Sequence, residues 1–155
     1  MTAARRTLGL ALLSVVLAAA AFLVARSWQA RDAPSFQRLA APESCDLRVG
    51  PCARRIGEGE VSFEITPADI PLMRTLTLRV RTNQLEVAGT VVEIRGLNMD
   101  MGLNRTVLQR DQAGVWVGET ILPLCSQRRM EWEAAVQLSL PTPVEVPFRF
   151  ATRRR

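Results

Sequence analysis

Short runs of alternating apolar and polar residues fill the chain from Glu60 onward, and they constrain the fold more than any other feature. Apolar residues occupy every second position in Glu60–Ile65, and within Leu72–Arg81 the residues Leu76, Leu78 and Val80 follow the same period. Successive side chains of a strand point to opposite faces, so this pattern is typical of antiparallel strands with one buried face. Turn-forming residues separate five further runs: Leu85–Ile94, Met99–Gln109, Val115–Leu124, Met130–Leu140 and Val144–Thr152.

About seven short strands with no amphipathic helix among them predict an all-β domain, an immunoglobulin-like β-sandwich over residues 45–155. Pro147 lies in the middle of the last run. Because proline has no backbone N–H for a sheet ladder, this run is expected at a sheet edge or at a bulge.

A second feature is the uncharged apolar run from Thr7 to Ala25, which Arg5, Arg6 and Arg26 bracket. A hydrocarbon core of about 30 Å needs about 20 apolar residues in a helix, so the run predicts one transmembrane helix. We expect an anchor over residues 1–28. The alanines of the run leave open the alternative of a cleaved signal peptide.

The basic residues before the run favour a cytoplasmic N-terminus, although arginines also follow it. The expectation is a single-pass protein of a bacterial inner membrane with its C-terminal domain in the periplasm. Residues 29–44 contain two prolines and no sustained period, which predicts a linker between the anchor and the domain.

Three cysteines bear on the compartment. Cys45 and Cys52 enclose a short segment that ends in a Gly-Pro turn, so a disulfide between them is predicted, as in an oxidising compartment. The alternative is a pair of free cytosolic thiols. The spacing alone also leaves open a pairing of either cysteine with Cys125.

Composition excludes several classes of function. The 20 basic residues are all arginine, and the net charge is +5, but the arginines are scattered along strand-like runs, so nucleic acid is not expected as a partner. They fit anionic lipid headgroups or an acidic partner instead. The chain has no histidine and no phosphate-binding motif, so neither an enzyme nor any catalytic residue is predicted. Glu131 and Glu133 are expected on a solvated strand face.

Sulfur-containing side chains supply the candidate site. Met99 and Met101 lie two residues apart, and on an extended chain both point to one face. With Cys125 and Met130 they form a set of soft ligands that selects Cu(I) if a metal binds. The alternative is that the methionines and Cys125 are core residues. Trp116 and Trp132 are likewise expected in the core or at an interface.

The order of these motifs resembles the FixH/YtkA-like periplasmic domains. The resemblance rests on three short motifs between Val61 and Thr152: Met99-x-Met101-Gly102, Gly114-Val-Trp116-x-Gly118-Glu-x-Ile121-x-Pro123, and Met130-x-Trp132-x-Ala134-x-Val136. It implies a membrane helix followed by an immunoglobulin-like domain, and a function in copper handling or in assembly of a haem-copper respiratory oxidase. Cys125 and the missing histidine depart from the family's pattern.

Two hypotheses about function follow. In the first, a membrane-anchored accessory protein holds Cu(I) at Met99 and Met101, with Cys125 and Met130, for an oxidase subunit. In the second, the domain is a metal-free scaffolding module whose sheet edge docks on a membrane protein of a respiratory complex.

Overall fold

The computed structural model describes residues 13–26 and 35–154 of the chain. The chain divides into two compact units, Met1–Ser35 and Phe36–Arg155. In the first unit, residues 13–26 form an α-helix whose side chains are exposed. Among the described residues, no helix is long and apolar enough to cross a membrane. The predicted span begins at Thr7, so residues 7–12 of it lie outside the described part of the chain.

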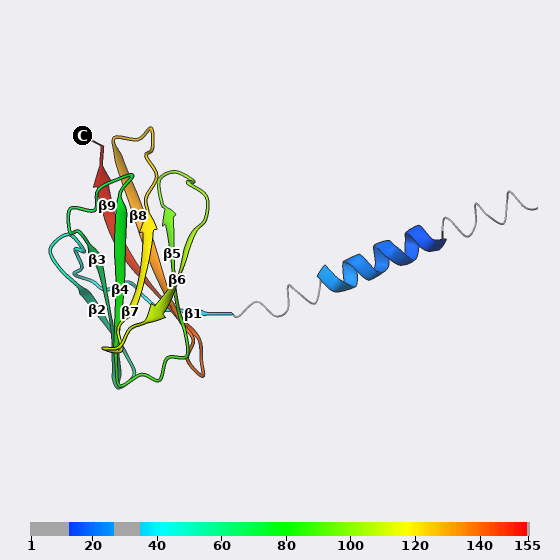
Figure 1. The fold of residues 1–155 in the computed structure, drawn as a ribbon, viewed down its shortest axis with the longest axis horizontal. Helices are drawn as coiled ribbons and strands as arrows, with labels where there is room; N and C mark the ends of the chain where they lie inside the picture. Colours follow the sequence, from blue (N-terminus) through cyan, green and yellow to red (C-terminus); the bar gives the residue numbers. More distant parts are fainter. Residues whose placement is uncertain (1–12, 27–34, 155) are drawn as a thin grey trace, which may run out of the picture. The chain divides into compact units, whose positions relative to one another are not determined.

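The second unit is built from strands, which confirms the prediction of a mostly β protein (Figure 1). In chain order the strands are β1 (Gln37–Arg38), β2 (Cys52–Ile56), β3 (Gly59–Thr66), β4 (Thr75–Asn83), β5 (Thr90–Gly96), β6 (Asn104–Arg110), β7 (Trp116–Ile121), β8 (Arg129–Leu138) and β9 (Val144–Arg153).

All nine strands belong to one curled sheet with the order β1-β9-β8-β5-β6-β7-β4-β3-β2. The strand β6 joins the two halves, because its first residues pair with β5 and its last two, Gln109 and Arg110, pair with β7. The curl brings distant strands face to face: the rings of Phe63 on β3 and Phe148 on β9 lie 5.3 Å apart between centroids.

Alternation explains how the core forms. Along β3, the residues Val61, Phe63 and Ile65 are buried while their neighbours are partly exposed, and β4 repeats the pattern. The tryptophans also join the core, as predicted: Trp132 and Trp116 are 1% and 8% exposed. Trp132 Nε1 donates a hydrogen bond of 2.9 Å to Thr152 Oγ1, which satisfies its one polar group.

The seven predicted runs correspond to β3–β9, with shifted ends. Two strands were not predicted. The strand β1 has only two residues, too few to show a period, and it lies inside the predicted linker of residues 29–44. In β2 only Cys52 is buried, so its sequence carries little apolar signal.

Pro147 lies where the sequence predicted, beside an open edge. The strand β1 pairs with β9 only at Val144 and Glu145. The outer edge of β9 is therefore free of β1 from Val146 onward, so the missing N–H of Pro147 interrupts no ladder there.

The strand β9 runs from one end of the sheet to the other. At its start it pairs with β1, where the chain enters the second unit, and at its other end Arg153 pairs with Arg129 of β8. The loop between β5 and β6 and the loop between β7 and β8 lie at this second end, which we term the distal end (Figure 1). Ten extended residues rise about 30 Å, so the two ends are well separated.

Candidate functional site

Two of the three cysteines form the predicted disulfide, and the third is a free thiol. Cys45 and Cys52 are joined by a disulfide, with their Cα atoms 5.5 Å apart. Cys125 is a free, buried thiol. The prediction of a Cys45–Cys52 pair is therefore confirmed, and Cys125 remains for other chemistry.

Two of the four predicted sulfur ligands are in direct contact. Cys125 Sγ lies 3.1 Å from Met99 Sδ, although 26 residues separate them in the chain. The contact joins the β5–β6 loop to the β7–β8 loop at the distal end. Metal–sulfur bonds are about 2.3 Å long, as in zinc sites, so two sulfurs at this separation are close enough to bind one ion.

The other two predicted ligands meet at Gly96, the last residue of β5. A Cβ atom at this position would lie 2.9 Å from Met130 Cε and 3.4 Å from Met101 Cγ, and it would collide with the carbonyl oxygen of Met99. The absent side chain of Gly96 therefore leaves the space in which the methionines gather. We refer to Met99, Met101, Cys125 and Met130 as the sulfur cluster.

The backbone around Asn98 fixes the loop that carries Met99. Asn98 Nδ2 donates to the carbonyl oxygen of Arg129 at 2.9 Å, and Asn98 Oδ1 accepts from the N–H of Glu131 at 3.0 Å. Leu97 N–H also donates to the carbonyl oxygen of Glu131, at 2.7 Å. These three bonds attach the loop to the first residues of β8, next to Met130.

Burial differs across the sulfur cluster. Met130 and Cys125 are 2% and 5% exposed, whereas Met99 is 38% exposed. Met101 is half-buried and packs against the core. Met99 therefore offers the most open route from solvent to the buried thiol of Cys125.

Met99 and Met101 do not lie on a strand, contrary to the alternation that predicted their common face. The strand β6 begins only at Asn104, and both methionines belong to the preceding loop. Asp100 Oδ1 accepts from Gly102 N–H, and Gly102 has a φ of 73°, so a turn interrupts the extended chain. A contact between two loops, rather than the strand period, brings Met99 Sδ to Cys125 Sγ.

The described residues contain no group of three or more His, Cys, Asp or Glu side chains placed to hold a metal ion. Methionine sulfur is not among those ligand types. The sulfur cluster contributes one thiol and three thioethers, which suit a soft ion such as Cu(I).

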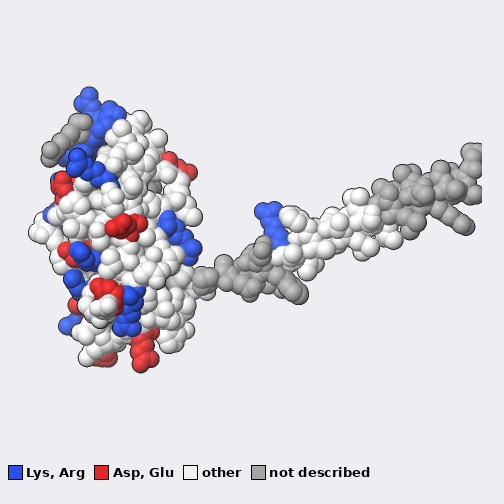
Figure 2. All heavy atoms as spheres, viewed as in Figure 1, with Lys and Arg blue, Asp and Glu red and all other residues white. Residues whose placement is uncertain are grey.

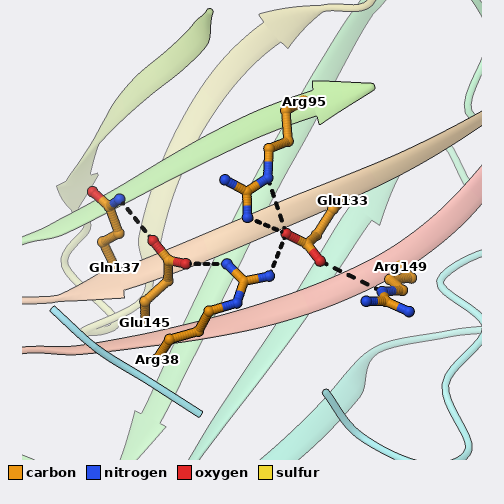
Figure 3. Close-up of polar contacts among 6 residues, drawn as sticks. All are labelled: Arg38, Arg95, Glu133, Gln137, Glu145 and Arg149. Atoms are coloured by element: carbon orange, nitrogen blue, oxygen red, sulfur yellow. Dashed lines mark hydrogen bonds and ion pairs between the residues drawn. The ribbon is translucent and has the colours of Figure 1, made fainter. Parts of the chain in front are cut away.

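Apart from the sulfur cluster, a cluster of charged and polar side chains surrounds Glu133 on the outer face of the sheet (Figure 3). Arg95 on β5 and Arg149 on β9 lie directly opposite Glu133 in the strand register. Glu133 Oε1 accepts from Arg95 Nη2 at 2.5 Å and from Arg38 Nη2 at 2.6 Å, and Oε2 accepts from Arg149 Nε at 3.4 Å.

The same cluster extends to β1 through Glu145. Arg38 pairs with Glu145 as well as with Glu133, and Gln137 Nε2 donates to Glu145 Oε2 at 3.1 Å. One arginine of a two-residue strand thus bridges two carboxylates. The cluster holds β1, β5, β8 and β9 together across the outer face.

The expectation that Glu133 is solvated is wrong: it is 1% exposed, whereas Glu131 is 52% exposed. Burial by itself raises the pKa of Glu133, but hydrogen bonds from Arg38 and Arg95 and their positive charges outweigh this effect and lower it. The hydrogen bond to Glu133 is the main cause of a raised pKa at Arg38. A carboxylate held ionised by three arginines fits a structural role.

No family model, no curated protein and no solved structure matches this chain.

Proposed function

We propose that this chain is a membrane-anchored periplasmic accessory protein that handles Cu(I), in copper supply to or assembly of a haem-copper respiratory oxidase. The observation that carries the proposal is the contact between Cys125 Sγ and Met99 Sδ at 3.1 Å. Two further thioether residues, Met101 and Met130, lie around Gly96, next to the backbone of Met99. The resemblance of the motifs to FixH/YtkA-like domains supports the same function.

The ligand chemistry supports Cu(I) over other metals. Thiolate and thioether sulfur select soft ions, and the chain has no histidine to favour zinc or Cu(II). Cys125, the only free cysteine, is 5% exposed, so burial protects its thiol from oxidation. Met99 at the surface is suited to the first contact with an incoming ion.

The proposed location rests on two features. The apolar run from Thr7 to Ala25 has the length of a transmembrane segment. The disulfide between Cys45 and Cys52 is typical of an oxidising compartment such as the periplasm. We also infer that the curled sheet is an immunoglobulin-like β-sandwich, which the Phe63–Phe148 contact between strands of opposite halves supports.

Copper titration of the full chain in detergent, with Cu(I) under reducing conditions, tests the proposal. We expect one ion per chain, and we expect Met99→Leu/Met101→Leu to weaken binding about a hundredfold because two thioethers are lost. Met73→Leu is the matched control, since Met73 is 63% exposed and lies outside the sulfur cluster. Unchanged affinity in the double variant would refute the copper site.

A second candidate function is a metal-free scaffolding module, which the open edge of β9 favours. Beyond Glu145 no residue of β1 pairs with β9, so its backbone groups are available to a strand of another protein. Three exposed leucines, Leu97, Leu103 and Leu124, add apolar surface near the sulfur cluster. This candidate predicts co-purification with a respiratory complex that survives Met99→Leu/Met101→Leu. Neither candidate involves an enzymatic step.

A further inference from the structure

A hollow lined by arginines also lies at the distal end, and none of the four residues of the sulfur cluster lines it. It has a volume of about 1030 Å³, and four arginines line it: Arg48, Arg74, Arg153 and Arg154. In Figure 2, basic side chains gather at the end of the second unit where β9 ends. Asp69 is the one carboxylate among the lining residues. We refer to this feature as the arginine hollow.

The arginines of the hollow carry uncompensated charge. Within residues 35–154, none of the four forms an ion pair, whereas Arg38, Arg95 and Arg149 are neutralised at Glu133. The Asp69 carboxylate does not reach any of them within ion-pair distance either. Like charges placed around one space repel each other, and a bound anion would relieve that repulsion.

The backbone presents these arginines from three separate segments. Arg48 N–H donates to Asp46 Oδ1 at 3.0 Å, beside the disulfide, and Arg154 N–H donates to the carbonyl oxygen of Arg128 at 3.1 Å. The loop that carries Arg74 is anchored by a hydrogen bond of 2.9 Å from Met73 N–H to the carbonyl oxygen of Leu122. The arrangement is therefore built by the fold and does not come from one flexible tail.

The loop before Arg74 is also strained. Ile70 and Met73 have φ values of 46° and 58°, a left-handed conformation that a β-branched residue such as isoleucine rarely adopts. Ile70 is 2% exposed, so packing holds it in place as part of the wall of the hollow. Strain that the surrounding structure maintains is concentrated at functional sites in proteins.

We propose that the arginine hollow binds a phosphate-bearing anion, supplied either by a phospholipid headgroup or by a soluble phosphate compound. The planar guanidinium group matches phosphate oxygens in pairs, which lysine does not. The volume is in the range of sites for small ligands rather than for a single ion. Leu72 and Leu124 give part of the lining an apolar character, which suits the glycerol part of a headgroup. The proposal is independent of copper binding.

Calorimetric titration of the copper-free full chain in zwitterionic detergent with pyrophosphate tests the site. We expect saturable binding that Arg74→Gln/Arg153→Gln weakens at least about tenfold, because two paired contacts are lost. Arg54→Gln/Arg55→Gln is the control with an equal change of charge, since both residues lie on β2 outside the hollow. Its effect is expected to stay below about twofold.

The same titration in lipid nanodiscs distinguishes a phospholipid headgroup from a soluble phosphate compound as the source of the phosphate. If headgroups fill the hollow, pyrophosphate binds more weakly in discs that contain phosphatidylglycerol than in discs of phosphatidylcholine alone. Equal affinity in both discs assigns the site to a soluble phosphate compound. The proposal is overturned if pyrophosphate does not bind, or if the control pair weakens binding as much as Arg74→Gln/Arg153→Gln.

Discussion

At the scale of single residues, Glu133 shows how a charge is kept in a buried position. Its carboxylate is 1% exposed, yet both oxygens accept hydrogen bonds from arginines on three other strands. The arginines themselves remain 41–67% exposed. The charge of Glu133 is therefore compensated by groups that reach to water, which limits the cost of desolvation.

Replacing Glu133 with glutamine is expected to destabilise the protein by about 2 kcal/mol, because three arginines lose their counter-charge while the shape of the side chain is kept. Urea denaturation measures this change in the free energy of unfolding. Glu131→Gln is the matched control on the same strand, where exposure should limit the effect to about 0.5 kcal/mol. Equal effects of the two changes would contradict a structural role for the cluster.

The lowered pKa of Glu133 predicts a dependence of stability on pH. The ordinary glutamate pKa is 4.5, so on acidification the unfolded chain takes up the proton first. The stability that Glu133 contributes is present above about pH 4.5 and is lost as the pH falls through its lower folded pKa. The difference in unfolding free energy between wild type and Glu133→Gln should shrink below that pH. A constant difference through acid conditions would show that Glu133 has an ordinary pKa.

At the scale of elements, the sequence predicts the strands β3–β9, but it predicts which of their residues are buried only where one face of the strand meets water. In β3 and β4, polar and buried residues alternate, and these strands were predicted directly. In β8, every residue from Trp132 to Leu138 is buried. Glu133 looks solvated in the sequence because the arginines that cover it come from other strands.

The sulfur cluster was predicted as a set of four residues but for the wrong geometric reason. Met99 and Met101 were expected to share a strand face, whereas a loop held by Asn98 brings Met99 to Cys125. The contribution of Gly96 was not predicted, because one glycine in a sequence does not reveal which atoms approach it. Metal binding itself stays a prediction.

The two ends of β5 give a matched test of that loop. Gly96→Ala is expected to destabilise the protein by about 1–3 kcal/mol, since a Cβ there collides with backbone at Met99. The collision displaces the methionines, so Cu(I) affinity should also fall. Gly89→Ala is the control, because its Cβ would meet only Ser139 at 3.6 Å. If both variants are equally stable, the Met99 carbonyl oxygen does not lie as close to Gly96 as the structure has it.

At the scale of the whole molecule, the curl of the sheet is held by contacts between its halves. Phe63 and Phe148 are fully buried and meet across the core. Their strands, β3 and β9, are not hydrogen-bonded to each other. Side-chain packing, and not the ladder, therefore closes the core between these strands.

We expect Phe63→Ala and Phe148→Ala to cost about 3–5 kcal/mol each, with a coupling of about 0.5–1.5 kcal/mol in the double variant. A double-mutant cycle in urea measures the coupling. Val107→Ala, at a side chain that is 58% exposed, should combine with Phe148→Ala additively. Additive effects of the two phenylalanine changes would show that their rings do not support each other.

The pairing of β1 with the start of β9 has a mechanical consequence. The two strands are parallel, and two backbone hydrogen bonds join them, from Gln37 N–H to the carbonyl oxygen of Pro143 and from Leu39 N–H to that of Glu145. A pull on the chain before Gln37, opposed by a load at the distal end, acts along the strands. It loads both bonds at once, together with the ion pairs of Arg38. Such shear has to break the whole contact in one step, so the second unit resists a force applied between the chain before Gln37 and the distal end.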